Sequence, residues 1–355
     1  NEENKQLGAS AFYGFNWKQV NRSNFIVSYS ALQSDKRQDE YAERSRFSPW
    51  FYQFSRILFS DINEINARTD NRLIINESNK FETGTGVLYY FTQKDDSEIH
   101  DSIIADATNL TLPYFYLQDH LTIWEKLKLS PGMRADYHIV SRKIFLQPRI
   151  SMVYSVNKFF NLNASWGLYN QFAVKNMVID SSGNYRYLWS LCENKSMPSL
   201  NASSAVAGIA FNRKGIAASI EGYMRRTDGM KRYIQEVGNI NAYDGESKTR
   251  GIDFFIKAEF RQQTFWASYT LSKTVERFSC FTDGKYRPSL YDQRHEVKLA
   301  GLVKIKSLHV SAAFVYGSGL PDPSTLLTDV QYTDPYTRLD AAIIYRILKR
   351  KIHLD

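Results

Sequence analysis

The most suggestive acid–base groups in this sequence are immediate neighbours along the chain. Asp119 is followed by His120, and Arg294, His295 and Glu296 form a second run. Neighbouring residues of a strand point to opposite faces, so neither run makes a good acid–base pair on a strand. The sequence also lacks the GxSxG, HExxH, P-loop and CxxC patterns. We therefore expect that the protein is not an enzyme.

Glycine and cysteine residues give two further chemical signals with structural explanations. Gly84 and Gly86 fall inside an expected strand and lack the helix that a dinucleotide site needs, which favours a close strand contact or a bend. Cys192 and Cys280 are too far apart for a CxxC metal site. Export would allow a disulfide between them, and two buried or reactive thiols are the alternative. We expect no cofactor and no metal.

The elements that position these residues are strands, because apolar residues recur at every second position. Residues 160–168 carry apolar side chains at the even positions and small or polar ones at the odd positions. Residues 252–260 show the same two-faced pattern. About fifteen strands are expected, at 6–17, 23–32, 62–75, 80–91, 113–124, 127–138, 144–155, 159–169, 203–211, 215–226, 249–260, 264–274, 293–304, 307–317 and 337–346.

Connection lengths alternate along the chain. Short connections are expected near 18–22, 76–79, 125–127, 156–158, 212–214, 261–263 and 305–306. Long ones are expected near 33–61, 92–112, 170–202, 227–248, 275–292 and 318–336, with a single short exception at 139–143. Most strands exceed the five or six residues typical of globular proteins and fit the roughly nine to eleven of a tilted membrane strand. The pattern predicts an antiparallel up-and-down transmembrane β-barrel.

Polar residues on one face of a strand should then point into the lumen of the barrel. Charged groups on the lipid face cost about 2–4 kcal/mol at the bilayer midplane. We expect Gln147 and Arg149 on one strand, and Asp253, Lys257 and Glu259 on another, to face the lumen. They would contact a plug or line a substrate route, or would simply supply the general polarity of a barrel interior.

Ligand contacts are expected in the long loops. The loop at 170–202 is the richest, because it contains Tyr185, Arg186, Tyr187 and Trp189. Clusters of aromatic and arginine side chains suit sugars, peptides and metal chelates alike. These four residues are the candidate substrate-binding set.

Composition narrows the class of protein. The formal net charge is +8, but the basic residues are spread along the chain, and many lie in the expected short turns. This distribution disfavours nucleic-acid binding. Aromatic residues make up 14% of the sequence and gather near strand ends, as in the interfacial girdles of membrane barrels.

Three stretches together resemble the barrel of TonB-dependent outer-membrane receptors, especially the forms common in Bacteroidetes. The first is YLQDHLTIWEKLKLSPGMR at 116–134, and the second is QPRISMVYSVNKFFNLNASWGLYNQ at 147–171. The third is YDQRHEVKLAG at 291–301, where the Asp-Gln-Arg-His run opens a late strand. The order of the three stretches carries the resemblance.

The resemblance implies a barrel of about 22 strands closed around an N-terminal plug. It also implies that TonB supplies energy through an N-terminal box. We expect residues 1–355 to be one partial barrel domain, without the plug, the TonB box and the closing strands. The implied partners are outer-membrane lipid, TonB and a small or oligomeric ligand, and a surface lipoprotein could cover the loops.

The function expected from the resemblance is import of a scarce nutrient across the bacterial outer membrane. Siderophores, cobalamin, glycans and peptides all fit this expectation. Two alternatives stay open, namely a passive porin-like or structural outer-membrane barrel and a soluble all-β glycan-binding protein.

Overall fold

The computed structural model describes residues 2–17, 21–41, 53–98, 101–179, 185–192, 198–236, 239–281, 283–322, 325 and 330–345. Their regular elements are eighteen β-strands. In this described part of the chain, no helix is both long enough and apolar enough to cross a membrane.

Fifteen of these strands form one continuous curved wall. Their bounds are β1 Glu2–Trp17, β2 Asn21–Tyr41, β3 Gln53–Asn76, β4 Asn79–Glu98, β5 Asp101–Ile123, β6 Leu127–His138, β7 Lys143–Ser155, β8 Phe160–Gln171, β11 Leu200–Arg213, β12 Ile216–Glu236, β13 Asn239–Phe260, β14 Gln263–Phe278, β16 His295–Ile305, β17 Leu308–Gly317 and β18 Tyr336–Tyr345. The remaining three are short: β9 Ala173–Ile179, β10 Tyr185–Leu191 and β15 Arg287–Pro288.

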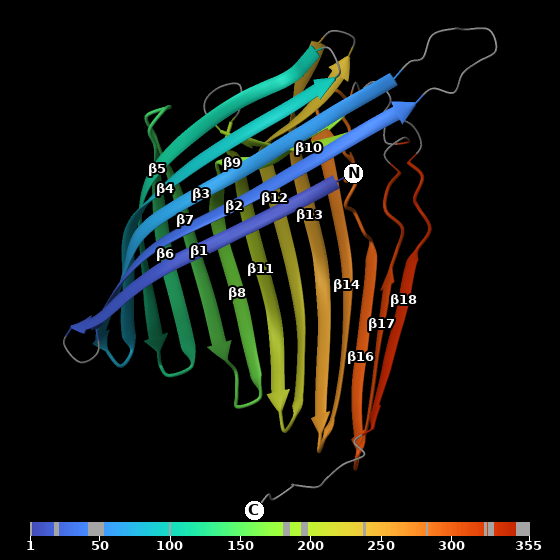
Figure 1. Cartoon of the computed structure of the whole chain (residues 1–355). Helices are drawn as coiled ribbons and strands as arrows, with labels where there is room; N and C mark the ends of the chain where they lie inside the picture. The colour runs from blue at the N-terminus through green and yellow to red at the C-terminus, as the bar shows by residue number, and fades with distance from the viewer. Residues whose placement is uncertain are drawn as a thin grey trace, which may run out of the picture.

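Each wall strand pairs antiparallel with the next wall strand along the chain. The pairing passes from β8 directly to β11 and from β14 directly to β16. Among the described residues, β1 pairs only with β2 and β18 only with β17, so the sheet is open. Figure 1 shows the curved wall, with β1–β5 slanting across its front. The predicted all-β up-and-down meander is confirmed, with each of the fifteen expected strands in place.

Tight turns join the strands at one end of the wall, which we call the short-turn end. Lys214, Arg261 and Lys306 adopt left-handed conformations, with φ of 42°, 57° and 55°. Gly215, with φ of 81°, follows Lys214 in the same turn. Left-handed central residues give a turn the twist that flanking antiparallel strands require. The predicted turn at 18–22 falls partly outside the described residues.

Several strands extend further at the opposite, long-loop end than the sequence predicts. β3 begins at Gln53 where we expected residue 62, and β12 runs to Glu236 where we expected residue 226. Much of the predicted loops 33–61, 92–112 and 227–248 is therefore strand. Both faces of these extensions carry polar residues, so the period-2 signal that marks a half-apolar strand is absent there.

The two faces of the wall differ in chemistry. One face exposes a band of large apolar side chains, including Trp166, Ile220, Ile252 and Phe254. We call this the outward face, because it lies opposite the side on which β9 and β10 pack (Figure 1). An exposed apolar band of this kind is typical of a barrel surface in contact with lipid.

Candidate functional site

A cavity of about 580 Å³ lies on the inner face of the wall. Polar and apolar side chains from several strands line it, and residues 172, 173 and 189 from the segment around β9 and β10 complete it. Its principal polar and aromatic lining residues are Glu64, Tyr90, Arg134, Asp136, Gln147, Arg149, Asn170 and Trp189. This cavity, which we call the wall cavity, contains two of the predicted lumen-facing residues and one of the predicted ligand residues.

A hydrogen-bonded network fixes the centre of the wall cavity. Arg134 donates from Nε and Nη2 to the carboxylate of Asp136, at 3.0 and 2.7 Å to Oδ1. Asp136 is almost fully buried and also accepts from Gln147 Nε2. Gln147 Oε1 in turn accepts from the backbone N–H of Asn170 at 3.2 Å. A buried carboxylate needs such partners, and together they hold this part of the wall in one arrangement.

The local sequence explains why these groups meet. Arg134 and Asp136 are two residues apart on β6 and therefore share a face. Arg134 lies directly opposite Gln147 of β7 in the register, and its guanidinium carbon lies 3.9 Å from the ring centre of Tyr114 on β5. Sequence reasoning missed Arg134 and Asp136 as site residues. The signal was present, because two polar side chains at spacing two on a predicted strand indicate a polar face, as Gln147 and Arg149 did for β7.

Arg149 is the second arginine that lines the wall cavity. It lies two residues beyond Gln147 on the same face of β7. Its Nε is buried and has no hydrogen-bond partner among the described residues. A buried guanidinium nitrogen without an acceptor is costly.

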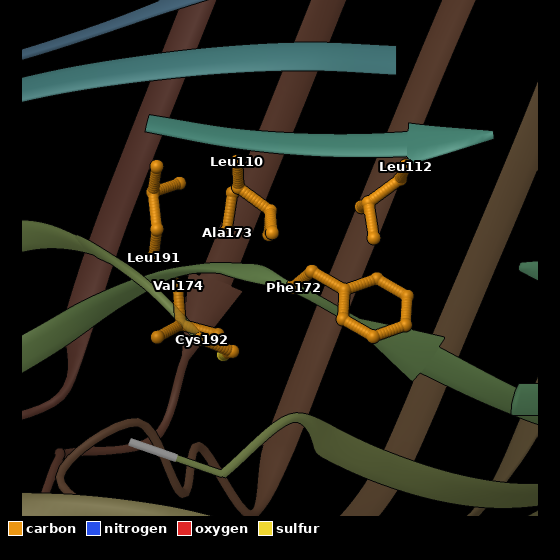
Figure 2. Packing of buried hydrophobic residues seen from close by; sticks show 7 residues of the cluster. All are labelled: Leu110, Leu112, Phe172, Ala173, Val174, Leu191 and Cys192. Carbon is orange, nitrogen blue, oxygen red and sulfur yellow. The ribbon is translucent and has the colours of Figure 1, made fainter. Parts of the chain in front are cut away.

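The hairpin formed by β9 and β10 packs against the inner face. Residues near both ends of segment 172–192 pack against Leu110 and Leu112 of β5, and both leucines are fully buried (Figure 2). Figure 2 labels these segment residues Phe172, Ala173, Val174, Leu191 and Cys192. Residues 177–179 of β9 also pair in parallel with residues 232–234 of β12. The predicted loop 170–202 therefore contains an ordered hairpin inside the curve of the wall, which the sequence did not reveal.

Two long-range hydrogen bonds anchor this hairpin. The Nε2 of His138 lies 2.6 Å from the carbonyl oxygen of Cys192, and its Nδ1 accepts from the backbone N–H of Ser141 at 3.0 Å. Because a carbonyl only accepts, Nε2 carries the proton. The backbone N–H of Trp189 donates to Ser60 Oγ at 3.0 Å. The predicted short exception at 139–143 is confirmed as the turn between β6 and β7, and this turn holds His138 beneath the hairpin.

The predicted substrate-binding residues divide into three groups. Trp189 lines the wall cavity beside Gln147 and Arg149. Tyr187 contacts Tyr291 instead, through the two hydroxyls and with ring centres 6.4 Å apart. Tyr185 and Arg186 lie on β10, but their side chains fall outside the described residues.

The predicted lumen-facing residues of β13 lie apart from the wall cavity. Asp253 stands opposite Glu221 of β12, which accepts a hydrogen bond from Asn163 of β8 at 2.9 Å. Lys257 and Glu259 form an ion pair at 2.5 Å. Paired residues of a sheet share a face, so all three lie opposite Ile252 and Phe254 of the apolar band. They belong to a second polar area on the inner side of the wall.

The Asp-Gln-Arg-His run has a structural role in the wall. Asp292 is buried, accepts from the backbone N–H of Thr274 at 2.6 Å and pairs with Arg294 at 3.1 Å. Gln293 accepts from Ser272 Oγ through its carbonyl and donates from its side chain to Ser318. The run thus joins β14, β16 and the end of β17.

Neither cysteine forms a disulfide in the structure. Cys192 is buried in the hairpin core and Cys280 is half-buried, and both are free thiols. Burial raises the pKa of Cys192 to about 12, so the thiol is protonated at neutral pH. The described residues contain no cluster of three or more His, Cys, Asp or Glu side chains that could hold a metal ion.

Solved structures resemble the whole wall. The pyoverdine receptor FpvA of Pseudomonas aeruginosa superposes with a TM-score of 0.65 at 12% identity, over 97% of this chain and 50% of that one. The ferric-catecholate import receptor Fiu of Escherichia coli K12 gives 0.68 at 10% identity, over 98% and 58%. The receptor PirA of Acinetobacter baumannii gives 0.67 at 10% identity, over 98% and 57%. The chain thus spans little more than half of these receptors, and at this identity the likeness shows the fold.

A sequence family matches the chain as well. No curated protein matches it by sequence. The family model described as "TonB dependent receptor-like, beta-barrel" matches residues 2–352, which is nearly the whole chain. The chain therefore belongs to the TonB-dependent receptor family, a family of outer-membrane β-barrel proteins.

Proposed function

We propose that this chain is the barrel wall of an energised importer, which takes up a scarce nutrient that arrives at the long-loop end. The observation that carries the proposal is the inward-packed hairpin beside the wall cavity, because it brings an aromatic residue over a fixed polar network. Trp189 supplies apolar contact, and Gln147 and Arg149 supply directed polar groups. Convergent aromatic and polar groups at a concave surface are typical of ligand sites.

Family membership frames this proposal. It confirms the predicted outer-membrane location and the expectation that the protein is not an enzyme, and it overturns the alternative of a soluble glycan-binding protein. The Bacteroidetes-like character rests on the three sequence stretches alone.

The proposed roles follow the positions of the residues. Tyr187 and Trp189, with Tyr185 and Arg186 on the same strand, contact the ligand at the hairpin. Arg149 receives an acidic or carbonyl group either of the ligand or of a plug. Asp253, Lys257 and Glu259 line the route on the other side of the interior. TonB drives release inward, and a surface lipoprotein over the loops is compatible with this arrangement.

The substrate class is open within this proposal. FpvA is named for pyoverdine, Fiu for ferric catecholate and PirA for a siderophore, and OprC, another structure with a similar fold, is named a copper transporter. Siderophore, cobalamin, glycan and peptide remain the candidates for this chain. Arg149 and Trp189 favour a ligand that combines a planar or ring-bearing part with an anionic or carbonyl part.

A transport assay separates this proposal from a passive barrel. Cells with and without the gene would be given radiolabelled candidates from the four classes, with and without a protonophore. An energised importer predicts uptake of at least one candidate that needs the gene and is lost with the protonophore. Gene-dependent uptake that survives the protonophore would favour the porin-like alternative and contradict TonB-driven transport.

Two variants test the assigned site once a substrate is found. Trp189→Ala and Arg149→Gln each remove a lining group of the wall cavity, and we expect each to weaken binding by about tenfold, or about 1.4 kcal/mol. Lys304→Gln, which changes an inner-face residue of β16 outside the wall cavity, serves as the matched control and should bind normally. If both cavity variants bind the substrate as tightly as the unaltered protein, the wall cavity is not the binding site.

A further inference from the structure

The outward face of β12–β14 carries cations at the edge of its apolar band. Met224, Arg250 and Lys273 lie in one row of paired residues across these three strands. Trp166 of β8 and Ala205 of β11 continue the same row. Since paired residues share a face, Arg250 and Lys273 point to the same side as the exposed Trp166 and Met224. They are on the membrane-facing side of the wall.

The next two rows toward the long-loop end add more charge, part of which is neutralised. Arg226 bonds to Asp228 at 3.0 Å and to Glu246 at 2.8 Å, and Glu246 also pairs with Arg277. Lys248 is exposed and lies 4.3 Å from the ring centre of Tyr286.

Three cations are left without acidic partners. Lys248, Arg250 and Lys273 form no ion pair with any described residue. We call these three residues the outer cationic patch. The remaining charges of the area balance, since two arginines face two carboxylates there.

A groove of about 540 Å³ joins this patch to the apolar band. The groove is lined by Trp166, Ala205 and Met224 as well as by the three cations. Two of its lining residues, Ser203 and Ala205, have small side chains that leave space for the groove. One row closer to the short-turn end, Ile252 and Leu271 continue the exposed apolar surface. The groove is therefore apolar at one end and cationic at the other.

We propose that this groove binds one phosphorylated lipid of the surrounding membrane leaflet. The phosphate contacts Arg250, Lys248 and Lys273, and an acyl chain lies along Trp166 and Met224. Cations on the lipid side of a barrel are unfavourable unless they lie at headgroup depth with an anionic partner. Arginine forms bidentate hydrogen bonds with phosphate, and lysine adds point charge. The inference rests on the outer-membrane location and is independent of the transported substrate.

Another sector of the outward face shows that the patch is local. Toward the long-loop end, β2–β4 present Tyr29, Asn63 and Tyr89, and Tyr29 donates to Asn63 at 2.8 Å. These are neutral groups typical of an interfacial girdle. A position near the lipid headgroups therefore does not by itself explain why β13 and β14 carry three cations on this face.

The test uses the receptor as it is extracted from its native membrane, and native mass spectrometry counts the lipid that it retains. The double variant Arg250→Glu/Lys273→Glu is compared with Lys128→Glu/Lys304→Glu, which makes the same charge change on the inner face of β6 and β16. We expect retained phosphorylated lipid in the unaltered protein and in the control, and at least fivefold less in the patch variant. Equal retention in the patch variant would overturn the proposal.

A second measurement needs no variant. Delipidated receptor in detergent is titrated with a phosphorylated lipid, with the same lipid after dephosphorylation, and with inorganic phosphate, while the midpoint of thermal unfolding is followed. The proposal predicts a rise in this midpoint with the phosphorylated lipid alone. An equal rise with the dephosphorylated lipid would mean that only the apolar groove acts, and a rise with inorganic phosphate would mean a free-anion site; either result contradicts the proposal.

Discussion

The two ends of the wall are held by different kinds of contact. At the short-turn end, Lys214 and Gly215 close their hairpin through local backbone conformation, with φ of 42° and 81°. At the long-loop end, His138 and Cys192 meet across 54 residues, and Ser60 and Trp189 meet across 129. Local turns depend on a few residues each, whereas the hairpin inside the wall depends on partners that are remote in sequence.

This difference explains where a binding site can form. The connections at the short-turn end are tight turns, so their residues do no more than join neighbouring strands. The long-loop end supplies a segment long enough to fold back and cover part of the inner face. The residues of the wall cavity on β6 and β7 then stand on rigid strands, while the segment that covers them is a connection between strands.

The largest expected effect is at Asp292, which joins β14 and β16 near the long-loop end. Asp292→Ala leaves the backbone N–H of Thr274 and the guanidinium of Arg294 without their acceptor. Loss of the acceptor for this N–H and of the bond to the partly exposed Arg294 together cost about 3–4 kcal/mol. We expect the barrel to unfold at clearly lower temperature, measured by heat-modifiable mobility on gels. Asp283→Ala, in an exposed part of the neighbouring loop, is the control, and equal loss in both variants would contradict the assigned role of Asp292.

The next effect concerns packing between the wall and the hairpin. Leu112→Ala removes a fully buried side chain that packs against the segment around β9 and β10. We expect a loss of about 3 kcal/mol, concentrated in hairpin docking and visible as faster hydrogen exchange in residues 173–191. Leu146→Ala on the exposed outward face of β7 is the matched variant. If both variants leave exchange in the hairpin unchanged, the hairpin is not held by this cluster.

A smaller effect tests the short-turn end. A Cβ at Gly215 would lie 2.4 Å from the carbonyl oxygen of Glu259, whereas one at Gly284 would meet no atom within 4 Å. Both glycines have positive φ. We expect Gly215→Ala to lower the unfolding free energy by about 2 kcal/mol and Gly284→Ala by about 1 kcal/mol. Urea unfolding in detergent compares the two, and a larger loss at Gly284 would refute the steric explanation.

The sequence predicts the wall well, because each wall strand crosses an apolar layer on one side and a polar interior on the other. Strands such as β8 and β13 show this alternation directly. It fails for β9, because its buried face carries Asn176 between Val174 and Val178 while its other face carries Met177 and Ile179, so the sequence shows no period-2 contrast. It also fails beyond the apolar band, where β3 continues with polar residues on both sides.

The site was predicted only in part for the same reason. The sequence singles out Gln147 and Arg149, which line the wall cavity, because they are polar residues at alternate positions of a clear strand. Asp136 lies beside them because of the register between β6 and β7. Residues 172 and 173 complete the cavity because the segment that contains the hairpin folds inward. No local pattern encodes which loop residues fold inward.

The natural thiol of Cys192 is a direct reporter of whether the hairpin packs inside the wall. Cys192 is buried between the hairpin and β5, and burial raises the pKa of its thiol to about 12. Intact cells carrying a Cys280→Ser receptor would be treated with a membrane-impermeant maleimide at pH 7, and labelling would be quantified by mass spectrometry. A Lys285→Cys variant of the same receptor gives the value for an exposed position. We expect at least tenfold slower labelling of Cys192 than of position 285; comparable rates would show that the hairpin does not pack inside the wall.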